Sequence, residues 1–119
     1  MAKPLFGYDG RFQWWSYNVS HGQLLLRSTK SPKRDTQIDV LFKDVVLVHM
    51  ATSIDDMEVL EAEEEDRPKG VELVAGRKVF VVRGKDFSGF VVAAVVFHSE
   101  GGDCHNDPSP LILQFPPDE

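Results

Sequence analysis

Residues whose side chains could hold a metal ion or act as nucleophiles gather after residue 97. They carry imidazole, thiol and carboxylate groups, and they are His98, Asp103, Cys104, His105 and Asp107. Zinc and other transition metals take these ligand types. Structural zinc sites use ligands in separated pairs, however, and the chain offers no second pair. We therefore expect no metal or other cofactor. A metal- or small-molecule-binding β-barrel that uses His98, Cys104 and His105 is the alternative function.

Cys104 is the single cysteine of the chain, so no disulfide can form within it. This cysteine usage fits a reducing compartment and predicts a cytoplasmic protein. A Cys104 thiolate with His98 or His21 as its base would make a nucleophile, and the sequence leaves that arrangement open. The chain lacks Gly-x-Ser-x-Gly, Gly-x-Gly-x-x-Gly, the Walker loop and His-Glu-x-x-His. The motifs therefore do not favour an enzyme.

Charged residues are distributed unevenly along the chain. Residues 1–54 hold 7 basic and 4 acidic residues, a net charge of +3, whereas residues 55–119 hold 6 basic and 15 acidic residues, a net charge of −9. Eight acids fall within residues 55–66, where they repel phosphate backbones and anionic lipid, so neither nucleic acid nor a membrane is an expected partner. The same charge would speed encounter with a basic protein. The residues expected at that interface are Glu61, Glu63, Glu64 and Glu65.

Two consecutive tryptophans, Trp14 and Trp15, supply a second candidate contact. Successive side chains of a strand point to opposite faces. The alternation of Trp15, Tyr17 and Val19 predicts that these three form the buried face of a strand over residues 12–19. Trp14 then points the other way, and large aromatic side chains often anchor interfaces. We therefore expect Trp14 either to contact a partner or to be covered by a neighbouring segment.

Short apolar runs separated by turn residues must position these side chains, and no long helical period is evident. The runs cover residues 12–19, 23–28, 36–42, 45–50, 57–63, 71–74, 78–83, 90–98 and 111–115. The first two runs predict a hairpin with Gly22 at a positive φ in its turn. The runs at residues 36–42 and 45–50 predict a second hairpin, joined by Lys43 and Asp44. Residues 71–83 predict a third hairpin. The valine-rich run at residues 90–98 predicts one central, most buried strand.

The segment at residues 53–62 is ambiguous, because Ser53 and Asp56 resemble a helix cap while the flanking chain is strand-like. We favour one helical turn over residues 53–56 and a strand over residues 57–63. The sequence thus predicts a mainly β fold, an antiparallel β-sandwich or small barrel built from consecutive hairpins, with one short helix near residues 53–62 left open. At 119 residues it predicts a single domain, 1–119. Within it we expect an irregular N-terminal arm at 1–10, a loop at 99–110 and a tail at 116–119.

Size, acidity and missing catalytic motifs together favour a small binding or interaction domain. One concrete version is an inhibitor or immunity-type protein that docks a basic partner through the acidic segment. No apolar stretch reaches the roughly 18 residues that a membrane-spanning helix needs. Self-association into a homo-oligomer is also left open, because edge strands and an exposed tryptophan would serve it equally well.

Overall fold

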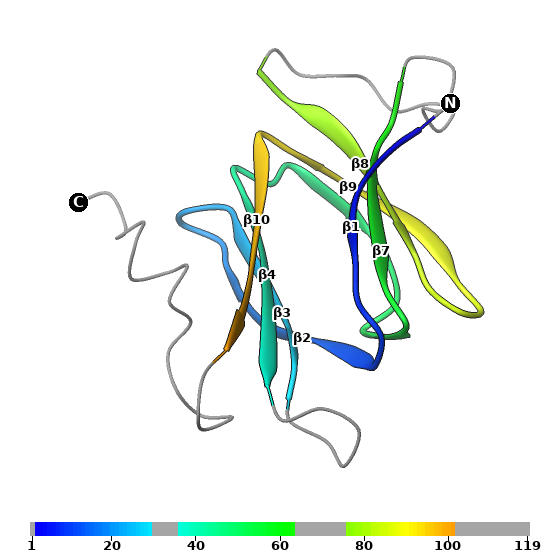
Figure 1. Cartoon of the computed structure of the whole chain (residues 1–119). Coiled ribbons are helices and arrows are strands. Elements are labelled where there is room, and N and C mark those ends of the chain that lie inside the picture. Colours follow the sequence, from blue (N-terminus) through cyan, green and yellow to red (C-terminus); the bar gives the residue numbers. More distant parts are fainter. Residues whose placement is uncertain (1, 30–35, 64–75, 102–119) are drawn as a thin grey trace.

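The computed structural model describes residues 2–29, 36–63 and 76–101, which form two antiparallel five-stranded sheets (Figure 1). The first sheet has the order β1 (Lys3–Gly7), β7 (Glu58–Glu61), β8 (Lys78–Arg83), β9 (Ser88–Ala93) and β5 (Leu47–His49). The second has the order β10 (Val95–Gly101), β4 (Gln37–Lys43), β3 (Gln23–Ser28), β2 (Arg11–Asn18) and β6 (Ser53–Asp55). The predicted antiparallel β-sandwich is confirmed. In the described part of the chain, no helix is long and apolar enough to cross a membrane.

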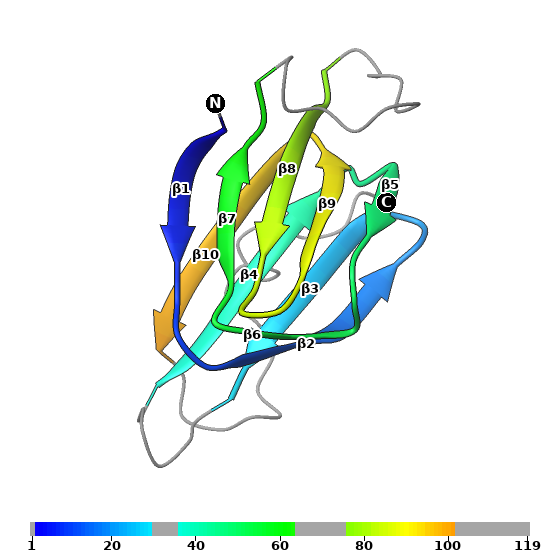
Figure 2. The ribbon, with the colours of Figure 1, turned by 90° about the vertical axis from the view of Figure 1, so that its right-hand side faces the viewer.

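The core lies between the sheets, which face each other in Figure 2. Alternate residues of each strand supply it, as the period of a pleated strand requires. From the second sheet come Phe12, Leu24, Leu26, Ile38, Val40 and Phe42, and from the first Val59, Phe80, Val82, Val91 and Ala93. The predicted alternation of residues 36–42 is confirmed by these positions.

The first predicted hairpin is confirmed as β2 and β3, and Gly22 in its turn has a φ of 57°. The predicted buried face of β2 is wrong, because Trp15, Tyr17 and Val19 are 36%, 42% and 80% exposed. The register shifts between Trp14 and Ser16, so Trp15 is an extra, bulged residue. A bulge interrupts strict alternation and re-aims the side chains beyond it.

The second predicted hairpin and the single strand over residues 90–98 are both wrong. β4 pairs with β10 in the second sheet, while β5 pairs with β9 in the first. The chain therefore crosses between the sheets after Lys43 and again at Ala94, in addition to its crossings from β1 to β2, from β5 to β6 and from β6 to β7. The crossings after Lys43 and at Ala94 lie side by side, since the Val46 N–H donates to the Val92 carbonyl over 2.9 Å and the Ala94 N–H donates to the Lys43 carbonyl over 3.0 Å.

Residues 53–55 form strand β6 where a helical turn was expected, and residues 58–61 form strand β7. The strand expected at residues 57–63 is confirmed, whereas the helical turn at residues 53–56 is wrong. Ile54 lies opposite Phe12 and is buried with it, so extended backbone places both side chains in the core. Asp56 then turns the chain towards β7 with a φ of 57°.

The segment predicted as an irregular arm, residues 1–10, contains strand β1. β1 pairs with β7, and its Phe6 lies opposite the core residue Val59. The predicted loop at residues 99–110 begins later than expected, because β10 continues pairing with β4 as far as Gly101. The predicted strand at residues 71–74, the predicted strand at residues 111–115 and the tail at residues 116–119 lie outside the described residues.

The outer face of β3 and β4 is also buried and carries an ion pair. The Arg27 Nε donates to the Asp39 Oδ1 over 2.8 Å, and the two side chains are 1% and 2% exposed. Leu25 and Leu41 lie beside them, both buried, with Phe97 packed against the pair. Arg27 also stacks over the Trp15 ring, with its Cζ 5.0 Å from the ring centroid.

We predict that Asp39→Asn strongly destabilises the protein, because it removes a buried negative charge that faces the buried Arg27 guanidinium. The expected loss in the free energy of unfolding is about 3 kcal/mol or more. The matched control is Arg11→Gln, which breaks the exposed Arg11–Asp55 pair and should cost less than about 1 kcal/mol. Urea denaturation of both variants measures the two losses, and equal losses would contradict a structural role for the buried pair.

We also predict that Gly22→Ala is more costly than Gly76→Ala. Both glycines have a positive φ, 57° and 79°, which costs an alanine about 1–2 kcal/mol. A Cβ on Gly22 would also lie 3.1 Å from the Val45 nitrogen and 3.2 Å from its oxygen, whereas a Cβ on Gly76 meets nothing within 4 Å. Crowding against backbone should add about 1–3 kcal/mol to the loss of stability. Thermal or urea unfolding checks this, and a Gly76 variant as unstable as the Gly22 variant would refute it.

Candidate functional site

Glu61, one of the acidic residues predicted at a partner interface, does not lie on a free edge. Glu61 is the last residue of β7, which has β1 on one side and β8 on the other. Its carboxylate lies 3.3 Å from the Lys78 Nζ. Glu63 is described just beyond β7, while Glu64 and Glu65 lie outside the described residues. In the described part of the acidic segment, the charge of Glu61 is therefore partly neutralised by Lys78 on the neighbouring strand β8.

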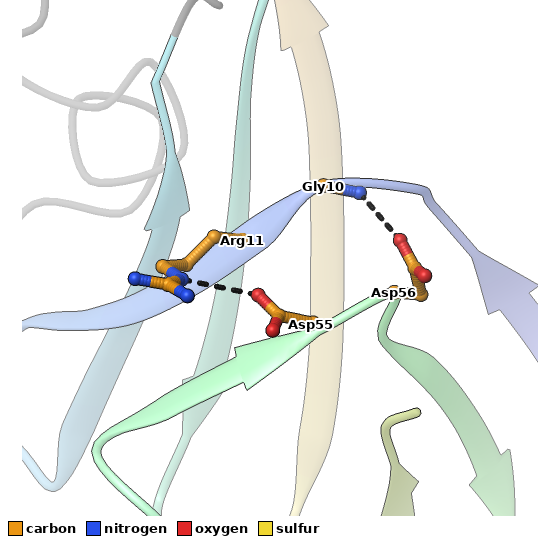
Figure 3. Close-up of polar contacts among 4 residues, drawn as sticks. All are labelled: Gly10, Arg11, Asp55 and Asp56. Carbon is orange, nitrogen blue, oxygen red and sulfur yellow. Dashed lines mark hydrogen bonds and ion pairs between the residues drawn. The ribbon is translucent and has the colours of Figure 1, made fainter. Parts of the chain in front are cut away.

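Two further acids of this segment, Asp55 and Asp56, lie at the opposite end of β7 and hold a turn (Figure 3). The Asp55 carboxylate accepts from the Arg11 Nε over 3.1 Å. The Asp56 carboxylate accepts from the Gly10 N–H over 2.9 Å. These contacts hold the connection between β1 and β2 against the connection between β6 and β7. Asp55 and Asp56 thus have structural roles.

Trp14, the candidate partner contact, is half-buried and packs against the core. Its indole N–H donates to the Ala51 carbonyl over 3.1 Å, and its backbone N–H donates to the Thr52 carbonyl over 3.0 Å. The neighbouring segment that could cover Trp14 is thus residues 51–52. Of the two tryptophans, Trp15 points outward.

His98, the first residue of the alternative metal cluster, lies on β10 in contact with aromatic side chains of the N-terminal strands. Its Nδ1 is 2.5 Å from the Tyr8 hydroxyl, and its ring stacks on Phe6 with centroids 4.1 Å apart. Cys104 and His105 lie outside the described residues. Within residues 2–29, 36–63 and 76–101, no group of three or more His, Cys, Asp or Glu side chains is arranged to hold a metal ion.

Tyr8 has a pKa raised above its usual value, first because burial disfavours the phenolate and second because of the Glu100 carboxylate. Glu100 in turn accepts a hydrogen bond from the Thr36 hydroxyl. A raised pKa keeps the phenol neutral and able to donate to the His98 imidazole. This cluster ties β10, at the edge of the second sheet, to the connection between β1 and β2.

The candidate interaction surface that sequence reasoning missed lies where the turn between β2 and β3 meets the connection between β4 and β5. The Val45 N–H donates to the Gly22 carbonyl over 2.8 Å and fixes the two segments together. Both segments carry exposed apolar side chains close to this contact along the chain. We call them the apolar junction; they are Tyr17 and Val19 from the first segment and Val46 and Leu47 from the second.

The turn that displays Val19 is itself ordered. The Asn18 carboxamide oxygen accepts from the His21 N–H over 3.2 Å, as in the local side-chain turns that asparagine favours. Val19 is 80% exposed, and Val46 is 49% exposed on the other segment. A cation stands next to the connection, because the Arg77 Nε donates to the Asp44 carbonyl over 2.7 Å. An apolar centre with a polar border is the usual composition of a binding surface.

A cleft of about 440 Å³ opens beside the apolar junction. Its lining residues are Ser16, Tyr17, Asn18, Val19, Gln23, Leu25 and Leu41. It combines apolar side chains with amides and a hydroxyl, so it can receive an apolar side chain and hydrogen-bond its neighbours. The sequence signal for this site was Val19 itself, an apolar residue directly before the turn residues Ser20, His21 and Gly22.

Comparison of the chain with protein-family models, with curated proteins and with solved structures gives no match. The function is therefore inferred from the geometry of the chain itself.

We predict that Tyr8→Phe changes how stability depends on alkaline pH. Because the pKa of Tyr8 is raised above 10.0 by folding, its contribution is intact below that pH and is lost as pH rises through the folded pKa. The free energy of unfolding of the native protein should therefore fall more steeply above about pH 10 than that of the variant. Urea titrations across this range measure the difference, and parallel curves would contradict it.

Proposed function

We propose that this protein is a protein-binding domain and that the apolar junction is its contact surface. The observation that carries the proposal is that four exposed apolar side chains, up to 80% exposed at Val19, belong to the two short segments that one backbone hydrogen bond joins. Contiguous exposed apolar side chains with a polar border mark interaction sites more often than single exposed residues do. Burying them would contribute about 25 cal/mol for each Å² of apolar surface removed from water, set against the entropy lost on association.

A basic partner fits the charge of the chain, which is −6 in total. Long-range attraction would raise the rate of encounter, while the apolar junction would slow dissociation. An inhibitor or immunity-type role is one form of this function, and the single cysteine supports a cytoplasmic setting. The acidic residues on β7 support the charge argument only in part, because Glu61 already contacts Lys78.

Site-specific photo-crosslinking in the native cell tests the proposal. A benzophenone side chain at Val19 should capture one protein, whereas the same group at Asp86 should not. Asp86 is exposed in the connection between β8 and β9, at the end of β9 opposite the crossing at Ala94. Mass spectrometry identifies the product.

A second substitution separates a specific surface from general stickiness. Val46→Lys should weaken capture at Val19 roughly tenfold or more, because it places a charge in the interface. Leu5→Lys is the control, since Leu5 is 38% exposed on β1 in the edge strand opposite β5. The proposal would be overturned if both lysine variants weakened capture equally. It would also be overturned if the only protein captured were a second copy of this chain.

A further inference from the structure

A second pocket lies on the outer face of the first sheet, the face turned to the viewer in Figure 2. It has a volume of about 390 Å³ and is formed mainly by β5, β9 and β8, which are neighbours in the sheet. We call it the outer pocket; its residues are Ala2, His49, Val81, Arg83, Ser88, Gly89 and Phe90. The apolar junction contributes none of them.

The floor of the outer pocket is one row of side chains across three strands. Phe90 lies opposite Val81 on one side and opposite His49 on the other. The His49 and Phe90 rings stack, with centroids 5.2 Å apart and planes inclined by 23°. Directly opposed residues of antiparallel strands project from the same face. The row therefore presents a flat surface that is aromatic at its centre.

Gly89 holds His49 close to this floor. A Cβ on Gly89 would collide with the His49 carbonyl oxygen and with the Phe87 ring, so no larger residue fits between β5 and β9 here. His49 is consequently fixed by backbone packing as well as by its ring contact. A preformed wall of this kind lowers the entropy that a ligand must lose on binding.

The next row across β8 and β9 supplies the polar groups. Arg83 lies opposite Ser88, and both are exposed. Glu58 on β7 lies directly opposite Arg83. Even so, among the residues that the structure describes, the Arg83 guanidinium forms no ion pair. Residues two apart on a strand share a face, so Arg83 stands next to Val81, and Ser88 next to Phe90.

We propose that the outer pocket binds an organic anion, namely a carboxylate attached to a flat apolar group. The apolar group would lie on Phe90 and His49, and the carboxylate would accept from the guanidinium fork of Arg83 and from the Ser88 hydroxyl. Arginine favours such planar, bidentate contacts with carboxylates. A free aryl carboxylate and the C-terminus of a peptide ending in an aromatic residue share this chemistry.

The test is an NMR titration of the full chain, labelled with ¹⁵N, against phenylacetate and its neutral counterpart phenylacetamide. Phenylacetate should shift the amide signals of His49, Gly89 and Phe90 to saturation, while phenylacetamide should bind at least about tenfold more weakly. N-acetyl-glycyl-phenylalanine with a free carboxylate is the peptide arm. Tighter binding of that peptide than of phenylacetate would assign the site to a protein terminus, and the reverse order to a free metabolite.

Matched substitutions test whether Arg83 is the anion contact. Arg83→Gln should weaken phenylacetate binding about tenfold, whereas Lys85→Gln should leave it unchanged. Lys85 is an exposed cation two residues further on and does not line the pocket. No saturable shifts, equal binding of the neutral amide, or equal effects of the two substitutions would each overturn the proposal. Crosslinking at Val19 should be unaffected by Arg83→Gln, so failure here is distinguishable from failure of the proposed function.

Discussion

A bent ribbon of two antiparallel strands joins the two sheets at the corner on which both candidate surfaces depend, while β1–β2 paired with β6–β7 joins them at another. Residues 37–49 run against residues 90–101, first as β4 with β10 and then as β5 with β9. The ribbon leaves the second sheet and enters the first at the two crossings, which the hydrogen bonds of Val46 and Ala94 hold together. Backbone pairing thus continues at the corner, where a buried loop would leave polar groups unsatisfied. The bend also brings Phe42 and Phe80 together in the core, with ring centroids 5.8 Å apart.

Both candidate surfaces are consequences of this bend. It sets the Val45 backbone against Gly22, where glycine is favoured because φ is 57° and a Cβ would lie 3.1 Å from the Val45 nitrogen. The close approach leaves Val19 and Val46 at the surface on either side. Beyond the bend, strand β5 places the His49 ring in stacking contact with the Phe90 ring. A fold whose corner were made by an ordinary hairpin after Lys43 would form neither surface.

The sequence was informative wherever the decisive interactions are local. The hairpin around Gly22, strand β8 and the inward positions Ile38, Val40 and Phe42 follow from turn chemistry and from a period of two. Alternation identifies a face of a strand but does not identify its partner, so the pairing of β4 with β10 and of β5 with β9 could not be predicted. The bulge at Trp15 depends on the register with β3, which is a tertiary property. Composition likewise located the acidic segment but could not show that β7 lies between two other strands.

Strand β5 connects the two surfaces. It has three residues, of which Leu47 belongs to the apolar junction and His49 to the outer pocket. Both project from the outer face of the first sheet, since they lie opposite Val92 and Phe90 on β9. β5 is at the edge of the sheet, so β9 alone holds it by strand pairing among the described strands. The pairing with β9 thus fixes the position of one residue of each surface.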